Sequence, residues 1–222
     1  MTGILTVLAA LFLAASQWFI WAYAPVEETM GLVQKIFYLH LPLAWWSFMS
    51  FLMVFVASIM VLATGKTVWD RLARAAAELG VLFSGLVLVT GSLWGKPIWN
   101  VWWTWDPRLT TTLVMWFVYA AYLLIGQAGI GGGRAFAVRA ALGILAFLDV
   151  PLVFYSARKW RSIHPTVFGS QGGGLDPDMW VAVLFSLVAV GFLWVVLLRI
   201  RFGQMNTNER LRRLFMKMTD QG

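Results

Sequence analysis

Long apolar stretches separated by short polar connections organise the whole chain of 222 residues. Because an α-helix rises about 1.5 Å per residue, about 20 apolar residues are enough to cross the hydrocarbon core of a bilayer. Six stretches reach this length, over residues 3–23, 43–63, 75–93, 111–128, 137–156 and 179–198. The pattern predicts an all-α, polytopic membrane protein with six transmembrane helices, forming a single membrane domain over residues 1–222.

The composition excludes the soluble alternatives. Hydrophobic residues make up 60% of the chain and charged residues only 12%, whereas a soluble domain has about 25% charged residues. The chain is therefore too apolar for a soluble or a disordered protein. It contains no cysteine, which excludes disulfides, thiolate metal sites, iron–sulfur clusters and cysteine nucleophiles.

The basic residues predict the orientation of the spans. Lys and Arg gather on the cytoplasmic side of membrane proteins, so the net charge of +7 does not call for a nucleic-acid partner. With the N-terminus inside, the inner connections 64–74, 129–139 and 199–222 hold eleven Lys and Arg residues, and the outer connections hold six. Both termini are therefore expected in the cytoplasm.

The last segment, residues 199–222, is a basic tail. Between residues 207 and 218 its basic and apolar residues alternate at helical spacing. Such a helix is typical of a segment that lies on anionic lipid at the membrane surface. The same pattern would also suit a docking site for a cytoplasmic partner.

Tryptophan is the residue type that points most directly to function, with fourteen copies in the chain. Five of them lie in one outer connection, residues 94–110. Aromatic belts account for some tryptophans, but five indoles packed in one loop would form a platform for a large, planar, apolar ligand. A capped, half-buried amphipathic loop is the alternative explanation. The candidate ligand-binding residues of this connection are Trp94, Gly95, Trp99, Trp102, Trp103, Trp105, Asp106 and Arg108.

The only two histidines, His40 and His164, both fall in outer connections. A histidine in an apolar setting is often structural, but two on the side of the Trp-rich connection suggest a metal site. Neutral imidazole is a good ligand for iron, and two histidines above a tryptophan surface would suit haem. Arg108 or Lys96 could then meet the propionates, because the arginine fork binds carboxylates bidentately. Asp106 and Arg108 could also form a local ion pair.

Two acidic residues, Glu78 and Asp149, fall inside predicted spans. Carboxylates within a membrane are commonly functional, so a secondary transporter or a proton-coupled membrane subunit is an alternative function. Asp149 could equally satisfy local donors, because Pro151 disturbs the backbone beside it. A quinone site on the tryptophan platform is a third possibility.

Two segments together resemble one family of membrane proteins. Residues 94–110 are similar to the tryptophan-rich WWD signature of the haem-handling membrane proteins of cytochrome c maturation. Residues 34–42, with the sequence QKIFYLHLP, narrow the resemblance to the CcmC branch of these proteins. The resemblance extends over about residues 34–195.

The resemblance implies a haem-binding and haem-transfer protein rather than an enzyme, located in the bacterial inner membrane with its haem site facing the periplasm. It implies that His40 and His164 are axial ligands of haem b and that the tryptophan-rich segment supports the ring. The partners it implies are the periplasmic haem chaperone CcmE, which receives the haem, the ATP-binding-cassette subunits CcmA and CcmB, and the small single-span protein CcmD.

Overall fold

The computed structural model describes residues 2–125, 133–160 and 175–219. Within these ranges six helical segments are long and apolar enough to cross a membrane, and no strand is formed. The prediction of an all-α protein with six membrane-spanning helices is confirmed. The elements are α1 (Thr2–Trp18), the π-helical turn η1 (Phe19–Tyr23), the 3₁₀ turn η2 (Leu32–Ile36), α2 (Phe37–Thr64), α3 (Thr67–Trp99), α4 (Pro107–Ile125), α5 (Gly133–Ala146), α6 (Asp149–Lys159) and α7 (Pro177–Thr219).

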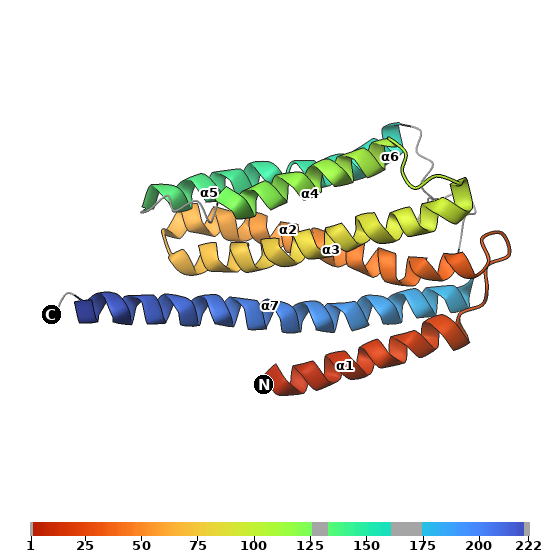
Figure 1. Cartoon of the computed structure of the whole chain (residues 1–222), viewed down its shortest axis with the longest axis horizontal. Helices are drawn as coiled ribbons and strands as arrows, with labels where there is room; N and C mark the ends of the chain where they lie inside the picture. Colours follow the sequence, from red (N-terminus) through yellow and green to blue (C-terminus); the bar gives the residue numbers. More distant parts are fainter. Residues whose placement is uncertain (1, 126–132, 161–174, 220–222) are drawn as a thin grey trace.

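The helices form a layered bundle (Figure 1). α2 and α3 lie side by side in the middle, α4, α5 and α6 cover one side of this pair, and α7 lies on the other side. α1 is the outermost helix and packs on α7. There Phe12 stacks on Phe185 and Phe192, with ring centroids 5.5 and 4.7 Å apart.

Glycines allow aromatic side chains of α2 to pack close to the backbone of neighbouring helices. Phe51 of α2 is fully buried and stacks on Tyr119 of α4, with ring centroids 3.7 Å apart. The same ring packs on Gly80 of α3, where an added Cβ would lie 2.4 Å from it. Gly191 of α7 leaves room for Trp46 of α2 in the same way, with an added Cβ 2.5 Å from the indole. Trp46 therefore belongs to the packing between α2 and α7.

The third span is longer than predicted. α3 begins at Thr67 and ends at Trp99, whereas the apolar pattern predicted residues 75–93. The first part of the predicted connection 94–110 is therefore helical, and the non-helical connection begins at Asn100. This residue has a φ of 56°, in the left-handed region that commonly ends helices.

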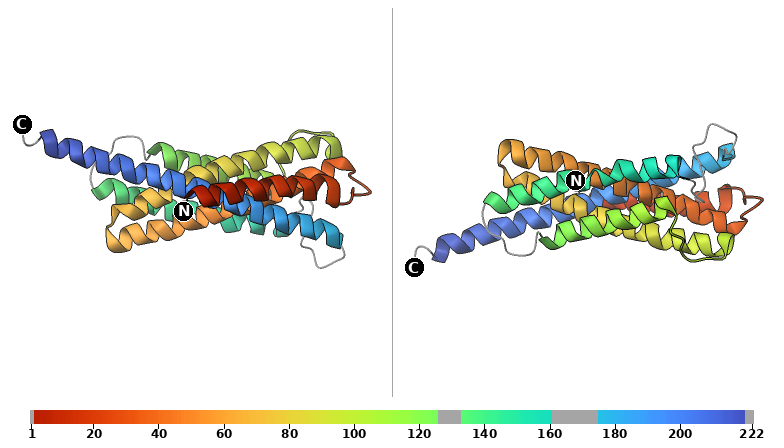
Figure 2. Two further views of the ribbon diagram at one scale, coloured as in Figure 1. Left: turned by 90° about the horizontal axis from the view of Figure 1, so that it is seen from below. Right: turned by 90° about the horizontal axis from the view of Figure 1, so that it is seen from above.

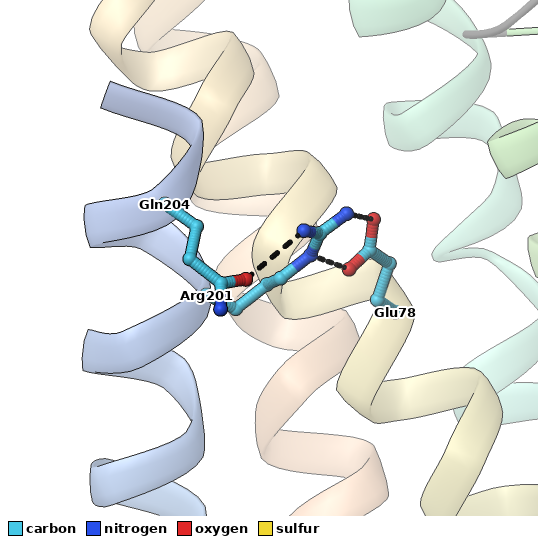
Figure 3. A network of polar contacts seen from close by, with 3 residues as sticks. All are labelled: Glu78, Arg201 and Gln204. Carbon is cyan, nitrogen blue, oxygen red and sulfur yellow. Dashed lines mark hydrogen bonds and ion pairs between the residues drawn. The ribbon is translucent and has the colours of Figure 1, made fainter. Parts of the chain in front are cut away.

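Two acidic residues of α3 form ion pairs with arginines of other helices. Asp70 of α3 is buried and accepts two hydrogen bonds of 3.0 Å from the guanidinium of Arg139 of α5. Glu78 of α3 forms a second two-point ion pair with Arg201 of α7, which also donates to Gln204 (Figure 3). Each pair satisfies a carboxylate that an apolar helix face would otherwise leave without a partner.

The fifth span is interrupted rather than continuous over residues 137–156. α5 ends at Ala146 and α6 begins at Asp149. Around the break, three main-chain N–H groups donate to carbonyls three residues back, at distances between 3.1 and 3.3 Å. Pro151 explains the change, because it has no N–H and its ring clashes with the carbonyl four residues earlier. The backbone tightens for one turn and then resumes as α6.

The basic tail continues α7 without a break. α7 contains 43 residues, which corresponds to about 64 Å at about 1.5 Å per residue. Its last part projects past the ends of the other helices (Figures 1 and 2). The predicted span 179–198 and the helical tail predicted at residues 207–218 are thus parts of one continuous helix.

Candidate functional site

His40 and the tryptophan-rich segment lie at one end of the bundle, on the right in Figure 1. α1 and α3 end there, and α2, α4 and α7 begin there. His40 lies in the first turns of α2, Trp94 and Trp99 lie in the last turns of α3, and the other three tryptophans lie in the connection 100–106. The fold thus brings His40 and the tryptophan-rich segment to the same end.

His40 is held by side chains and backbone of α3. The residue is only 8% exposed, and its Nδ1 lies 2.9 Å from Oγ1 of Thr90. Thr90 in turn donates its hydroxyl to the carbonyl of Leu86 at 2.7 Å. An added Cβ at Gly91 would lie 3.3 Å from Cε1 of the imidazole. The ring centroid of Trp94 lies 6.0 Å from that of His40.

Thr90 and Gly91 were not found by sequence reasoning. Thr90 and Trp94 are four residues apart, so they lie on one face of a helix. That spacing was visible in the sequence, but it does not show that this face meets His40. The contact depends on how α2 packs on α3, which brings together residues fifty positions apart.

Trp94 is a core residue as well as a neighbour of His40. It is only 3% exposed, and its ring lies 5.9 Å from that of Phe37. Both belong to a hydrophobic cluster, here called the end cluster, that joins η1, α2, α3 and α7 at this end. Its buried members are Ile20, Ala24, Phe37, Tyr38, Trp94, Met179, Ala182 and Val183.

The other tryptophans of the segment are more exposed. Trp99 and Trp103 are half-buried, Trp102 is 58% exposed and Trp105 is 76% exposed. Trp103 and Trp105 meet edge to face, with centroids 5.9 Å apart and planes at 83°. These two indoles therefore form an angled surface rather than a flat one, and part of that surface is open to a large apolar ligand.

Asp106 caps the start of α4. It is buried, its carboxylate accepts the main-chain N–H of Arg108 at 2.9 Å, and its carbonyl accepts the N–H of Thr110 at 2.9 Å. An aspartate at the N-cap followed by a proline, here Pro107, is a common start of a helix. The hydrogen bond described between Asp106 and Arg108 thus involves the main chain of the arginine.

Lys96 and Gly95 shape the end of α3. The ammonium group of Lys96 donates to the carbonyl and to Oδ1 of Asn100, both at 3.1 Å. An added Cβ at Gly95 would lie 3.4 Å from the Trp99 ring, which is an ordinary contact. The side chain of Lys96 therefore stabilises the turn that leads into the connection to α4.

His164 lies outside the described residues, as do all of residues 161–174. Among the residues that the structure does describe, no three or more acidic or histidine side chains form a group that could hold a metal ion. A free metal ion needs several protein ligands, whereas haem iron receives four from the porphyrin and needs only axial ones. A buried, oriented His40 among aromatic side chains fits an axial ligand of haem iron.

The sequence matches the model of a known protein family. A family model described as heme exporter protein C, or CcmC, matches residues 1–217. The chain belongs to the CcmC family.

Individual proteins that are similar to this chain agree with this assignment. The heme exporter protein C of Escherichia coli is 34% identical over 178 residues, which cover 78% of this chain and 71% of the relative. That of Rhodobacter capsulatus is 31% identical over 219 residues, covering 94% and 87%. A Marchantia polymorpha protein named as a putative cytochrome c biosynthesis ccmC-like mitochondrial protein is 28% identical over 175 residues, covering 78% and 74%.

The two acidic residues inside the spans of this CcmC-family chain differ in their surroundings. Glu78 is paired with Arg201, so it has a structural role. Asp149 is half-buried, and its Oδ2 has no hydrogen-bond partner among the described residues. It lies at an apolar crevice of about 380 Å³ between α4 and the α5–α6 pair, lined by Val114, Val118, Leu142, Leu145, Ala146, Leu148 and Leu152.

Proposed function

We propose that this protein binds haem at the tryptophan-rich end of its bundle, on the periplasmic face of the inner membrane, and transfers it to the haem chaperone CcmE during cytochrome c maturation. The observation that carries the proposal is the imidazole of His40, which Thr90 orients beside Trp94 at the end where exposed tryptophans gather. The relatives named for haem export and for cytochrome c biosynthesis support the same function.

The residues at this end have complementary roles in holding haem as cargo. Haem iron accepts neutral imidazole as an axial ligand, and His40 and His164 supply the two nitrogens. Trp102 and Trp105 cover apolar parts of the ring, because an indole face excludes water from a planar ligand. Arg108 meets a propionate through its guanidinium.

The distribution of charge supports a periplasmic site. Lys66, Arg71 and Arg139 lie toward the end of the bundle opposite to His40, together with the basic end of α7. A Lys and Arg excess is typical of the cytoplasmic side. The chain has no glycine-rich phosphate-binding motif, which is consistent with an ATP-driven step in separate CcmA and CcmB subunits, with CcmD as the small partner.

An absorption titration tests the proposal directly. Haem is added to the detergent-purified full chain, and spectra are recorded for the wild type, His40→Ala and His164→Ala. We expect a Soret band in the wild type and a weaker or shifted band in each variant. Free imidazole should restore the band in His40→Gly, because it replaces the missing ligand. A wild type that binds no haem, or two variants that bind as the wild type does, contradicts the proposal.

The competing functions give different results in the same system. Loss of cytochrome c maturation in Asp149→Asn but not in Trp105→Ala would favour a transporter or a proton-coupled subunit. Quinone-dependent redox activity that persists without both histidines would favour a quinone site. Haem passing from the loaded wild type to purified CcmE would support the transfer step.

A further inference from the structure

The hydrogen bonds of Thr90 determine where the proton of the His40 imidazole lies. The Thr90 hydroxyl has one proton, and its oxygen lies 2.7 Å from the carbonyl of Leu86 and 3.2 Å from that of Val87. Carbonyl oxygens only accept hydrogen bonds, so this proton is committed to the main chain. Oγ1 of Thr90 therefore accepts the proton on Nδ1 of His40, 2.9 Å away.

This arrangement selects one tautomer of the neutral ring. With the proton on Nδ1, the lone pair lies on Nε2. Histidines that bind metals almost always donate their other N–H to a fixed acceptor, which sets the ring orientation and increases the basicity of the coordinating nitrogen. His40 is thus prepared as an Nε2 ligand before any iron is present.

Contacts with α3 restrict the same edge of the imidazole. At Gly91 an added Cβ would lie 3.3 Å from Cε1 and 3.9 Å from Nδ1 of His40, so the ring rests on the backbone of α3. Trp94, one turn later, has its plane at 64° to the imidazole. Positions 90 and 91 therefore hold the Nδ1–Cε1 edge, with Trp94 beside the ring, and the hydrogen bond to Thr90 is the polar part of this contact.

We propose that Thr90 is a positioning residue for His40, which holds the proton on Nδ1 so that Nε2 coordinates haem iron. Thr90 acts through the imidazole and does not itself contact the haem. The proposal rests on the proposed function, in which His40 is an axial ligand.

The first test measures the tautomer without haem. Nitrogen NMR of the full chain labelled with ¹⁵N-histidine contains signals from only two histidines, and a His164→Ala variant assigns those of His40. At mildly alkaline pH we expect a protonated Nδ1 and an unprotonated Nε2 in the wild type. Thr90→Val should lose this preference and Thr90→Ser should keep it. An Nε2–H tautomer in the wild type overturns the proposal.

The second test measures haem affinity. Thr90→Val keeps the shape of the side chain but removes the acceptor, and we expect affinity to fall by about 10–100-fold, as for other outer-shell partners of metal ligands. Thr90→Ser should bind nearly as the wild type does. Ser92→Ala is the matched control, since Ser92 also donates to a carbonyl of α3, that of Leu88 at 3.0 Å, and should leave affinity unchanged.

The outcomes separate the two proposals. Absence of His40-dependent haem binding in the wild type refutes the proposed function, and the role of Thr90 with it. His40-dependent binding that is equal in the wild type and in Thr90→Val refutes only the role of Thr90. If Thr90→Val does not fold, the wild-type tautomer decides the matter, because an Nδ1–H tautomer supports the role of Thr90 and an Nε2–H tautomer overturns it.

Discussion

The ammonium group of Lys35 is buried beside the end cluster and donates hydrogen bonds to main-chain carbonyls. The residue is 5% exposed, and its Nζ donates to the carbonyls of Ile20, Trp21 and Ala24 at 2.6, 3.3 and 3.2 Å. These carbonyls lie at the end of the first span, where intrahelical donors run out and the helix dipole favours a cation. Lys35 thus fastens the first span to the start of α2.

Replacing Lys35 by methionine should destabilise the protein while keeping the apolar volume. A hydrogen bond to a charged group contributes about 1.5–3 kcal/mol, so losing several buried ones should lower the melting temperature clearly. Tryptophan fluorescence of the detergent-solubilised chain during heating measures this. Lys66→Met is the control, because Lys66 is exposed between α2 and α3, and equal melting of the two variants would contradict the role of Lys35.

Replacing Trp94 by alanine should lower the stability of the protein, whereas replacing Trp105 should lower its affinity for haem. Trp94 is buried in the end cluster, so Trp94→Ala should cost about 3–5 kcal/mol of stability. Trp105 is 76% exposed, so Trp105→Ala should leave the melting temperature nearly unchanged but weaken haem binding. Thermal melts and haem titrations of both variants measure these effects. Trp45→Ala, which removes an exposed indole of α2, should change neither property.

At the scale of the helices, ion pairs between residues far apart in the sequence place charged side chains inside long helices. The apolar runs predicted all six spans, because lipid exposure requires such runs. They did not predict the start of α3 at Thr67, since Asp70 is buried in that first part and is paired with Arg139 on another helix. The start of α4 was predictable in principle, because Asp106 and Pro107 form a capping pattern. The contact of His40 with Thr90 was not, since it depends on helix packing.

The buried pair between α3 and α5 should be sensitive to removal of one partner. Asp70 and Arg139 have side chains only 5% and 9% exposed, and an unpaired buried charge costs about 3–5 kcal/mol. Asp70→Asn should therefore destabilise the protein strongly, and adding Arg139→Met should recover much of the loss. Glu209→Gln is the control, because its pair with Arg213 is exposed and contributes about 0–1 kcal/mol. Denaturation of all three variants in detergent measures the difference.

The whole molecule has two unlike ends. The end with His40 is closed by aromatic side chains of the end cluster and by the connection 100–106. The other end carries the ion pairs and the long projection of α7. The haem-binding proposal uses only the first end, so changes at the second should act through stability or through partners rather than through haem affinity.

Removing residues 207–222 tests this separation. α7 is fastened to α3 before that point, since Arg201 pairs with Glu78 and Arg71 donates to Asn206 at 2.6 Å. From Arg210 to Thr219 every residue is exposed, so this part contributes little to the packing of the bundle. The shortened chain should therefore melt at the same temperature and bind haem with the same affinity as the full chain. Arg201→Met in the full chain should lower the melting temperature, because it leaves Glu78 without its partner. If the shortened chain melts as early as Arg201→Met, the end of α7 supports the bundle and the two ends are not independent.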